Sequence, residues 1–225
     1  MEGLPARPSE IKPMACFDTA SQCTTADHLS EDVVVLGCSN GLKFYTRATN
    51  TIEMKNKAAK VQTAVHNGHV YLTSKEIGEV KVCQLDGTTA KQLFSFKSTV
   101  NTIHRIAANN SHVYVLDRGP GKIIQYDIAQ KKVTNEFFAK KHAAVVTGTV
   151  KIMNIQLCSD GSLLITAHDK KLLKMRVAST QLDLIWSAAF EDKVCAVTEA
   201  SNGYIFDAGK RSKKVFLLDA TGRPL

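Results

Sequence analysis

The sequence TIHRIAANNSHVYVLDRGPGKIIQYDIAQKKVTNEFF, from Thr102 to Phe138, shows the pattern that decides the fold. Short runs of β-branched, aromatic and other apolar residues alternate there with compact polar turns, which predicts four antiparallel strands. The turns contain Asn, Gly and Pro, which hairpins need where the backbone φ is positive or fixed. The expected strands are 102–108, 112–117, 122–128 and 132–138.

A polar turn followed by a strand-like run recurs along the whole chain. The turns end at Asp32, Gly68, Ser111, Gly161 and Gly203, and the intervals between these residues are 36, 43, 50 and 42. A period of about 40 to 45 residues, with room for four strands in each unit, is typical of β-propeller blades. We therefore predict an all-β protein, a β-propeller with about five visible four-stranded blades.

The ends of the repeat array set the predicted domain boundaries. The fifth unit stops after its third strand, 214–220, so the C-terminus does not supply a strand for its outer edge. Either residues 10–17 supply that strand and close the ring, or the chain is part of a larger propeller. We predict a propeller domain over 14–225, preceded by a flexible or edge-strand segment, 1–13. The polar stretch 53–62 is expected to connect two blades.

Two units carry a more specific motif. In the third unit, Val115 to Gly119 is followed by Ile123 to Asp127, and in the fifth, Ile205 to Gly209 is followed by Val215 to Gly222. These segments resemble NHL repeats. One Asp ends a strand and a second Asp opens a later turn, where its carboxylate can accept backbone hydrogen bonds.

The resemblance to NHL repeats implies a propeller, typically of six blades, that binds RNA or protein on one face. Some relatives are lyases or quinoprotein-like enzymes, so the fold by itself does not select the activity. The WD40 repeat is the nearest alternative resemblance. The chain has no Trp-Asp dipeptide, and its sole tryptophan, Trp186, lies in an apolar run that indicates a core position.

The composition is that of an ordinary soluble globular protein, with 225 residues of which 44% are hydrophobic and 22% charged. No apolar run is long enough to span a membrane, and the N-terminus lacks the apolar stretch of a signal peptide. Six cysteines without a CxxC pair predict buried free thiols in a reducing compartment. We expect no membrane association and a cytoplasmic location, with the nucleus as the alternative.

The sequence shows no catalytic constellation. It contains no nucleophile elbow, P-loop or HExxH motif, and its cysteines lack metal-ligand spacing. The closest histidines, His66 and His69, flank an Asn-Gly turn, where solvation is more common than binding of a metal or substrate. We predict no enzyme activity, no cofactor and no metal. A hydrolase or quinoprotein-like site assembled in the central channel from several blades is the second alternative.

Positive charge is concentrated at one end of the predicted blades. The net charge is +8, and most of the excess falls in the connections between second and third strands and between successive blades. In an antiparallel blade these two kinds of connection emerge on the same face, here called the basic face. Its predicted binding residues are Arg118, Lys122, Lys140, Lys141, Lys170, Lys171, Lys210, Arg211, Lys213 and Lys214. The opposite face is nearly balanced, with Arg47, Lys131 and Lys132 against Asp86 and Asp160.

A basic face attracts acidic protein surfaces or phosphate backbones. RNA recognition commonly uses aromatic side chains that stack on bases, and Phe190 is the only aromatic residue in the connections of this face. The sequence therefore predicts a non-catalytic interaction module that binds an acidic protein partner, with RNA binding as the alternative.

Overall fold

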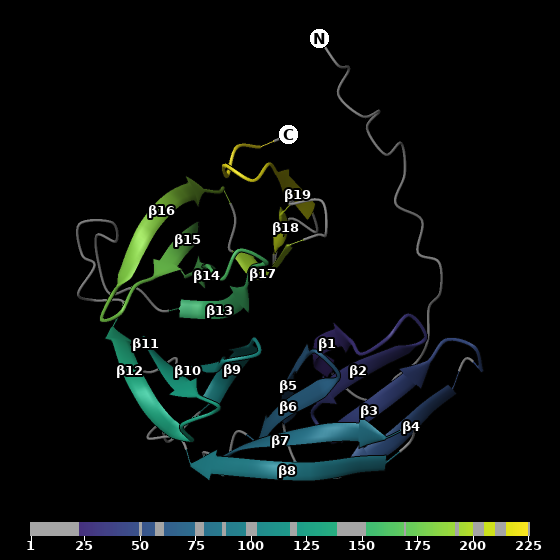
Figure 1. Ribbon diagram of the computed structural model, residues 1–225. Helices are drawn as coiled ribbons and strands as arrows, with labels where there is room; N and C mark the ends of the chain where they lie inside the picture. The colour runs from purple at the N-terminus through teal and green to yellow at the C-terminus, as the bar shows by residue number, and fades with distance from the viewer. Residues whose placement is uncertain are drawn as a thin grey trace.

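The structure, a computed structural model, consists of β-strands joined by turns (Figure 1). It describes residues 23–49, 51–56, 61–74, 79–86, 89–97, 103–117, 121–138, 152–168, 170–191, 194–199, 205–209 and 215–224. Within these ranges every regular element is a strand, so the all-β prediction is confirmed. No helix that could span a membrane occurs in this part of the chain.

Four sheets are four-stranded, antiparallel and ordered as in the chain. The first blade contains β1 (Cys23–His28), β2 (Val33–Cys38), β3 (Gly41–Thr46) and β4 (Thr51–Asn56). The second contains β5 (Val61–His66), β6 (His69–Ser74), β7 (Glu79–Asp86) and β8 (Thr89–Lys97). The third contains β9 (Ile103–Ala108), β10 (His112–Asp117), β11 (Lys122–Asp127) and β12 (Lys132–Phe138). The fourth contains β13 (Ile152–Leu157), β14 (Leu163–Ala167), β15 (Lys171–Val177) and β16 (Leu182–Ala189). A fifth sheet contains β17 (Val194–Glu199), β18 (Ile205–Gly209) and β19 (Val215–Leu218).

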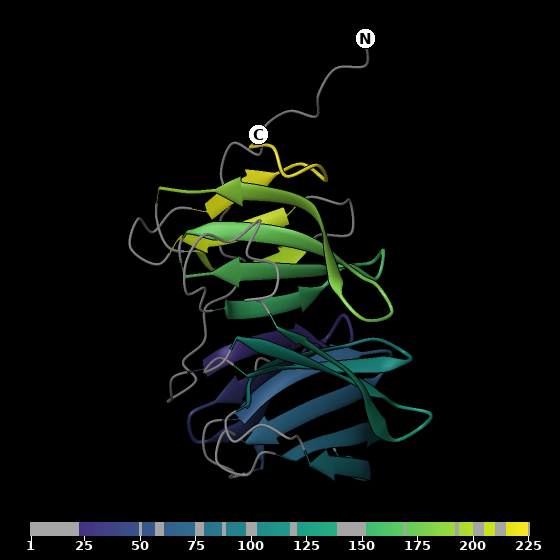
Figure 2. The ribbon, with the colours of Figure 1, turned by 90° about the vertical axis from the view of Figure 1, so that its left-hand side faces the viewer.

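The sheets follow one another around an arc, with the first strand of each sheet innermost (Figure 1). Strands β1, β5, β9, β13 and β17 pack side by side in that order. Figure 2 shows the green and yellow strands of the last two sheets layered above the purple to teal strands of the first three. The arrangement is a β-propeller with four complete blades. A complete fifth blade and a larger ring stay predictions.

The hydrophobic core lies between the faces of neighbouring sheets. One cluster joins Leu116 of the third blade to Leu163 of the fourth, and both side chains are fully buried. Equivalent clusters lie between the first and second blades, the second and third blades, and the fourth blade and the fifth sheet. Phe96 and Tyr126 stack between the second and third blades, with ring centroids 3.6 Å apart. Burial of each large apolar side chain contributes about 1.5–3 kcal/mol, so these interfaces fix the positions of the innermost strands.

The turn chemistry follows the sequence pattern. Between β5 and β6, Asn67 (φ 48°) and Gly68 (φ 74°) both adopt the left-handed conformation that a two-residue hairpin turn requires. After β11, Asp127 Oδ1 accepts a backbone hydrogen bond at 2.7 Å, and after β19, Asp219 Oδ1 accepts one at 2.8 Å. The second Asp of the sequence motif therefore closes a turn in both units.

The predicted strands of the third blade match the structure, and β10 and β12 coincide with 112–117 and 132–138. The prediction for the stretch 53–62 needs correction. Expected to connect blades, this stretch begins inside β4 and ends inside β5. Its polar composition has a simple cause, because β4 is the outermost strand of its sheet and Glu53 is exposed to solvent.

The oxidation state of two cysteines also differs from the prediction. Cys23 and Cys38 lie opposite each other in the register of β1 and β2 and form a disulfide. Cys83 and Cys158 are buried free thiols, as predicted. The disulfide was missed because the pairing depends on strand register, which spacing along the chain does not specify.

The chain reverses direction after β19. Leu218 pairs with Pro224 in an isolated antiparallel bridge. Trp186 of β16 packs on this turn, and its Nε1 donates a hydrogen bond to Ala220 O at 3.2 Å. The segments 1–13 and 10–17 of the sequence prediction lie outside the described residues.

Candidate functional site

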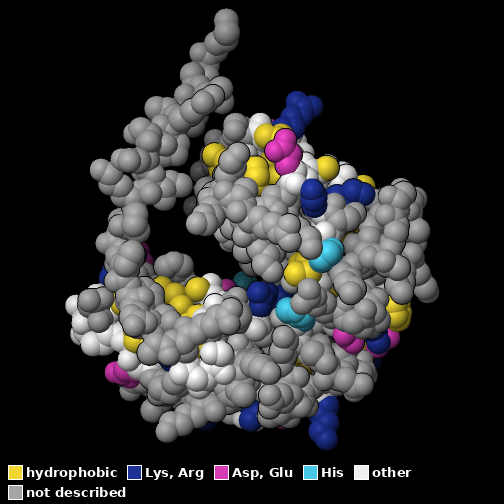
Figure 3. Space-filling model, turned by 180° about the vertical axis from the view of Figure 1, so that it is seen from behind, with side chains coloured by type: hydrophobic (Ala, Val, Ile, Leu, Met, Phe, Trp, Pro, Cys, Tyr) yellow, Lys and Arg dark blue, Asp and Glu magenta, His cyan; other side chains and the backbone are white. Residues whose placement is uncertain are grey.

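A cavity of about 850 Å³ lies at the centre of the arc. Its lining comes from β1, β5, β9, β13 and β17 and from turns that follow these strands. Each innermost strand faces the axis, so residues far apart in the sequence meet around one space. Figure 3 shows the centre of the molecule hollowed, with basic and histidine side chains beside the hollow.

Arg105 of β9 is held at one end of the cavity by two neighbouring blades. Its Nε donates a hydrogen bond to Asn154 Oδ1 of β13 at 3.1 Å, and a terminal guanidinium nitrogen donates to Gln62 Oε1 of β5. The backbone N–H of Ile155 also donates to Asn154 Oδ1, at 3.0 Å. These bonds fix the orientation of the guanidinium, because its partners are themselves held by the sheets.

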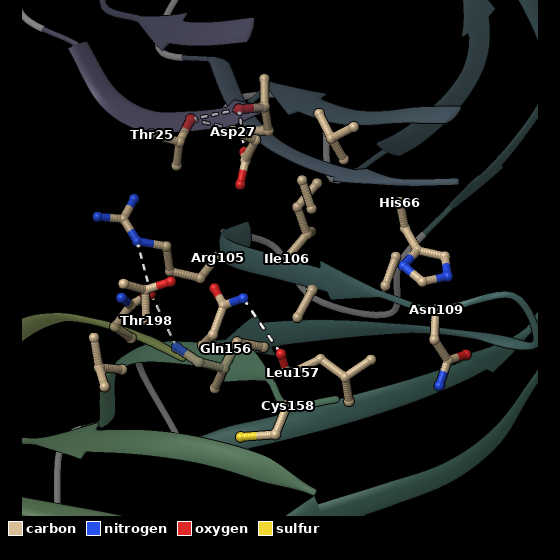
Figure 4. Close-up of a pocket in the computed structure, with 18 of the residues that line it drawn as sticks. Thr25, Asp27, His66, Arg105, Ile106, Asn109, Gln156, Leu157, Cys158 and Thr198 are labelled. Atoms are coloured by element: carbon tan, nitrogen blue, oxygen red, sulfur yellow. Dashed lines mark hydrogen bonds between the residues drawn. The ribbon is translucent and has the colours of Figure 1, made fainter. Parts of the chain in front are cut away.

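Asp27 of β1 lines the same end of the cavity, on the wall opposite Arg105 (Figure 4). Its Oδ2 accepts a hydrogen bond from Thr63 Oγ1 of β5 at 3.1 Å. The hydroxyls of Thr25 and Thr63 are 2.7 Å apart, and the backbone N–H of Thr63 donates to Thr25 Oγ1 at 3.1 Å. The carboxylate is therefore positioned by the contact between the first and second blades.

The cavity changes character along its length. Ile106 and Leu157 lie between the charged end and a polar rim that includes His66 and Asn109 (Figure 4). At the rim, His66 Nε2 and Asn110 Oδ1 form a hydrogen bond of 3.1 Å between the second and third blades. No group of three or more His, Cys, Asp or Glu that could hold a metal ion occurs within the described ranges.

A second polar cluster joins the fourth blade to the fifth sheet. Lys174 Nζ lies 2.9 Å from Asp160 Oδ2 and 3.9 Å from Glu199 Oε1, and its side chain is only 9% exposed. Burial acts to lower the pKa of Lys174, but its hydrogen bond with Asp160 and the nearby carboxylates raise it above the ordinary value. Burial raises the pKa of the Cys158 thiol to about 11. Lys174 is therefore charged and Cys158 protonated at neutral pH. This state suits a structural role, in which the ion pairs of Lys174 link the fourth blade to the fifth sheet.

We expect acid to weaken the interaction between Asp160 and Lys174. Burial alone would raise the pKa of Asp160, but hydrogen bonds from Ser162 and Lys174 lower it from 3.8 to about 2. A carboxylate with a lowered pKa stabilises the folded state above its unfolded pKa, and this contribution is lost as pH falls to the folded value. Urea denaturation should show that Asp160→Asn is less stable than wild type near neutral pH and that the difference shrinks between about pH 4 and about pH 2. A difference that stays constant with pH would contradict this assignment.

Three of the predicted binding residues fall within the described ranges: Lys122, Lys170 and Lys171. Lys170 lies in the second-to-third-strand connection of the fourth blade, while Lys122 and Lys171 begin the third strands of the third and fourth blades. The backbone N–H of Phe190 donates to Lys170 O at 2.9 Å, and Lys170 Nζ donates to Glu191 O at 2.7 Å. The connection after β16 therefore lies beside the β14–β15 turn, as the basic face requires. Outside the described residues lie Arg118, Lys140, Lys141, Lys210, Arg211, Lys213 and Lys214.

The described lysines of the basic face differ in their exposure to solvent. Lys170 is exposed, whereas Lys122 Nζ lies 2.6 Å from Glu136 Oε1 and its side chain is only 15% exposed. At the opposite end, Glu31 and Asp32 in the β1–β2 turn are exposed and add negative charge that was not counted from the sequence. They lie at the same end as Arg47, Lys131 and Lys132, which are also exposed.

Sequence analysis did not identify the charged end of the cavity. The available signal was Arg105, a charged residue inside a predicted innermost strand. Its partners Gln62 and Asn154 come from two other blades. Only the packing of successive blades brings these three residues together.

Comparison with solved structures settles the fold class. A protein of unknown function from Bacteroides caccae superposes with a TM-score of 0.66 at 11% identity, over 92% of this chain and 81% of that chain. The WD40 β-propeller domain of Doa1 superposes with a TM-score of 0.64 at 9% identity, over 91% of this chain and 67% of that chain. The fold resembles a WD40 β-propeller.

A chain of a mitotic checkpoint complex is similar to this WD40-like propeller, with a TM-score of 0.65 at 13% identity over 96% of this chain and 71% of that chain. Identities this low show the fold alone. No family model and no curated protein matches the sequence. The resemblance to NHL repeats therefore stays a prediction.

Proposed function

We propose that this WD40-like propeller is a non-catalytic interaction module whose basic face binds an acidic protein. The observation that supports the proposal is the pair of hydrogen bonds between the β14–β15 turn and the connection after β16. These bonds place two kinds of connection at one end of the fourth blade. Lys170 is exposed at this end, and Lys171 follows it at the start of β15.

The charges at the two ends of the propeller favour one-sided attraction. Lys97, at the end of β8, is exposed and belongs to the same end as Lys170. The opposite end exposes both signs of charge, with Glu31 and Asp32 near Arg47, and with Lys131 and Lys132 at another turn. An acidic surface would therefore be attracted more strongly by the basic face than by the opposite end, which orients the encounter.

A protein partner fits the basic face better than RNA does. Stacking on bases needs an accessible aromatic ring. Phe190 is half-buried, and its ring centroid lies 5.2 Å from that of Phe216. The only aromatic side chain predicted for this face is therefore engaged in packing between the fourth blade and the fifth sheet.

Charge reversal on the basic face tests the proposal. We expect Lys140→Glu, Lys141→Glu, Lys170→Glu and Lys171→Glu, combined, to slow association with poly-L-glutamate by at least about tenfold, because electrostatic steering is lost. The salt dependence of affinity should flatten, while the free energy of unfolding changes by about 0.5 kcal/mol per exposed site. Surface plasmon resonance over a salt series measures the first two effects.

The matched control is reversal at Arg47, Lys131 and Lys132 on the opposite face, which should leave association unchanged. Equal loss in both variants would exclude one-sided binding. Poly(U) provides the second ligand, and tighter salt-dependent binding of poly(U) than of poly-L-glutamate would favour RNA. A pull-down from lysate with and without nuclease separates the same two outcomes, because a protein partner survives digestion.

A further inference from the structure

His66 and His69 face each other across the β5–β6 hairpin. They are directly opposed in the antiparallel register, on either side of the turn at Asn67 and Gly68. Residues opposed in this way point to the same face of the sheet, with Cβ atoms about 5 Å apart. The two histidines are half-buried, whereas the turn between them is exposed. Two imidazoles therefore lie close together near the surface.

The packing of the hairpin shows which face this is. Ala64 lies two residues before His66 and belongs to the core cluster between the second and third blades. Tyr71 lies two residues after His69 and belongs to the same cluster. Successive side chains of a strand alternate between faces, so both histidines lie on the face that packs against the third blade. His66 also lines the rim of the central cavity (Figure 4).

Hydrogen bonds fix which nitrogen of each ring carries the proton. Asn110 Oδ1 lies 3.1 Å from His66 Nε2, and an amide oxygen can only accept, so His66 Nε2 is the donor. The same oxygen accepts from Asn67 Nδ2 at 3.2 Å. His69 Nδ1 lies 3.0 Å from the backbone oxygen of Asn67 and donates to it. A neutral imidazole carries one proton, so the lone pairs are on His66 Nδ1 and His69 Nε2.

Both histidines have the hydrogen-bond pattern of metal ligands. A ligating imidazole commonly donates its other N–H to an oxygen, which orients the ring and raises its basicity. A metal–nitrogen bond is about 2 Å long, so rings from two opposed residues can reach one ion. Imidazole suits Ni²⁺, Cu²⁺ and Zn²⁺, whereas Mg²⁺ and Ca²⁺ prefer oxygen ligands. Sequence spacing alone favours solvation of this pair, but its register and hydrogen bonds favour binding.

We propose that His66 and His69 together bind one divalent transition-metal ion of the class Ni²⁺, Cu²⁺ or Zn²⁺, with water in the remaining positions. Asn67 and Asn110 act as positioning residues, because their oxygens accept the second N–H of each ring. The site lies at a turn between first and second strands, at the end of the propeller opposite the basic face. It does not depend on the binding of an acidic protein there.

Electron paramagnetic resonance with the Cu²⁺ complex of iminodiacetate tests the site on the intact chain. This complex leaves coordination positions for two imidazoles, so a lone histidine binds it weakly. We expect one equivalent to bind, with echo modulation from two imidazoles. His66→Gln and His69→Gln should each weaken binding at least about tenfold, since even changes in the outer shell of a metal site cost that much. The spectrum is measured on wild type, so it stands even if a variant fails to fold.

Matched variants separate chelation from general effects. His112 begins β10 as His69 begins β6, and His112→Gln should leave binding unchanged. Asn110→Ala should weaken binding by about tenfold while two imidazoles remain bound, and Asn110→Asp, which keeps an acceptor oxygen, should restore much of it. Charge reversal at Lys170 and Lys171 should not affect metal binding, which distinguishes this site from the proposed protein interface.

Isothermal titration calorimetry extends the test to the free ions. Zn²⁺ should bind the wild-type chain and Mg²⁺ should not, because the ligands are nitrogen atoms. The proposal is overturned if neither the Cu²⁺ complex nor Zn²⁺ binds wild type, or if the spectrum shows a single imidazole. It is also overturned if folded His66→Gln and His69→Gln both bind as tightly as wild type.

Discussion

Replacing Lys174 with methionine is expected to lower the free energy of unfolding by about 3 kcal/mol. Methionine has a similar length, so the change removes the charge and its hydrogen bonds with little loss of volume. The variant leaves Asp160 and Glu199 close to one another without their cation, and the Glu199 side chain is only 11% exposed. An uncompensated carboxylate in such a site is costly because it is largely removed from water.

Urea denaturation of Lys174→Met against wild type measures this loss. The control is Arg176→Met, which removes an exposed cation from the same strand, β15, and should change stability by no more than about 0.5 kcal/mol. Adding Glu199→Gln to Lys174→Met should recover part of the loss, because the buried negative charge is then absent. Equal effects of Lys174→Met and Arg176→Met would show that the cluster does not stabilise the join between the fourth blade and the fifth sheet.

Gly37→Ala should destabilise the protein by about 3 kcal/mol, because no space exists for a methyl group there. A Cβ at this position would lie 2.3 Å from Thr25 Oγ1 and 2.8 Å from the backbone oxygen of Val61. The second contact is with backbone, so side-chain rotation cannot relieve it. Gly37 therefore allows the first blade to approach the second closely enough for Thr25 to bond Thr63.

Thermal and urea denaturation of Gly37→Ala measure the effect. Gly68→Ala is the control. Open space surrounds a Cβ at Gly68, so this change adds backbone strain, at a φ of 74°, without a steric clash. That variant should lose only about 1 kcal/mol, from strain in the left-handed conformation. A smaller loss at Gly37 than at Gly68 would mean that the two blades separate easily, and the geometry around Asp27 would then be adjustable.

Sequence reasoning reached the blades because hairpin turns leave local signals. The third blade shows this most clearly, since Asn109 and Asp127 each cap the turn that their position predicts. Sequence reasoning failed at β4, an outermost strand. Its described side chains, Thr51, Ile52 and Glu53, are not fully buried, so this part of the strand resembles a connection. Spacing was also no guide to the disulfide between Cys23 and Cys38, because a shift of register would separate the two sulfur atoms.

The same distinction, between local signals and contacts made only by packing, applies to the candidate sites. Lysines in turns near the ends of strands could be assigned to a face, because strand direction alone decides at which end a turn emerges. The cavity could not be assembled, because Asp27, Arg105 and Asn154 belong to three blades and approach one another only through inter-blade packing. Lys174 was missed for a related reason. Its neighbours Leu172, Leu173 and Met175 are apolar and buried, and nothing nearby in the sequence supplies its carboxylate partners.

Trp186 gives the molecule an optical property that follows from its position. It is the only tryptophan in the chain, and a Cβ at Gly222 would lie 2.6 Å from its ring, so the turn after β19 is in close contact with the indole. The tryptophan emission of the protein therefore originates at one place, where the end of the fifth sheet covers the outer strand of the fourth blade. Its wavelength reports how well water is excluded from that contact. Fluorescence will thus follow the detachment of this turn, while far-ultraviolet circular dichroism averages over every sheet.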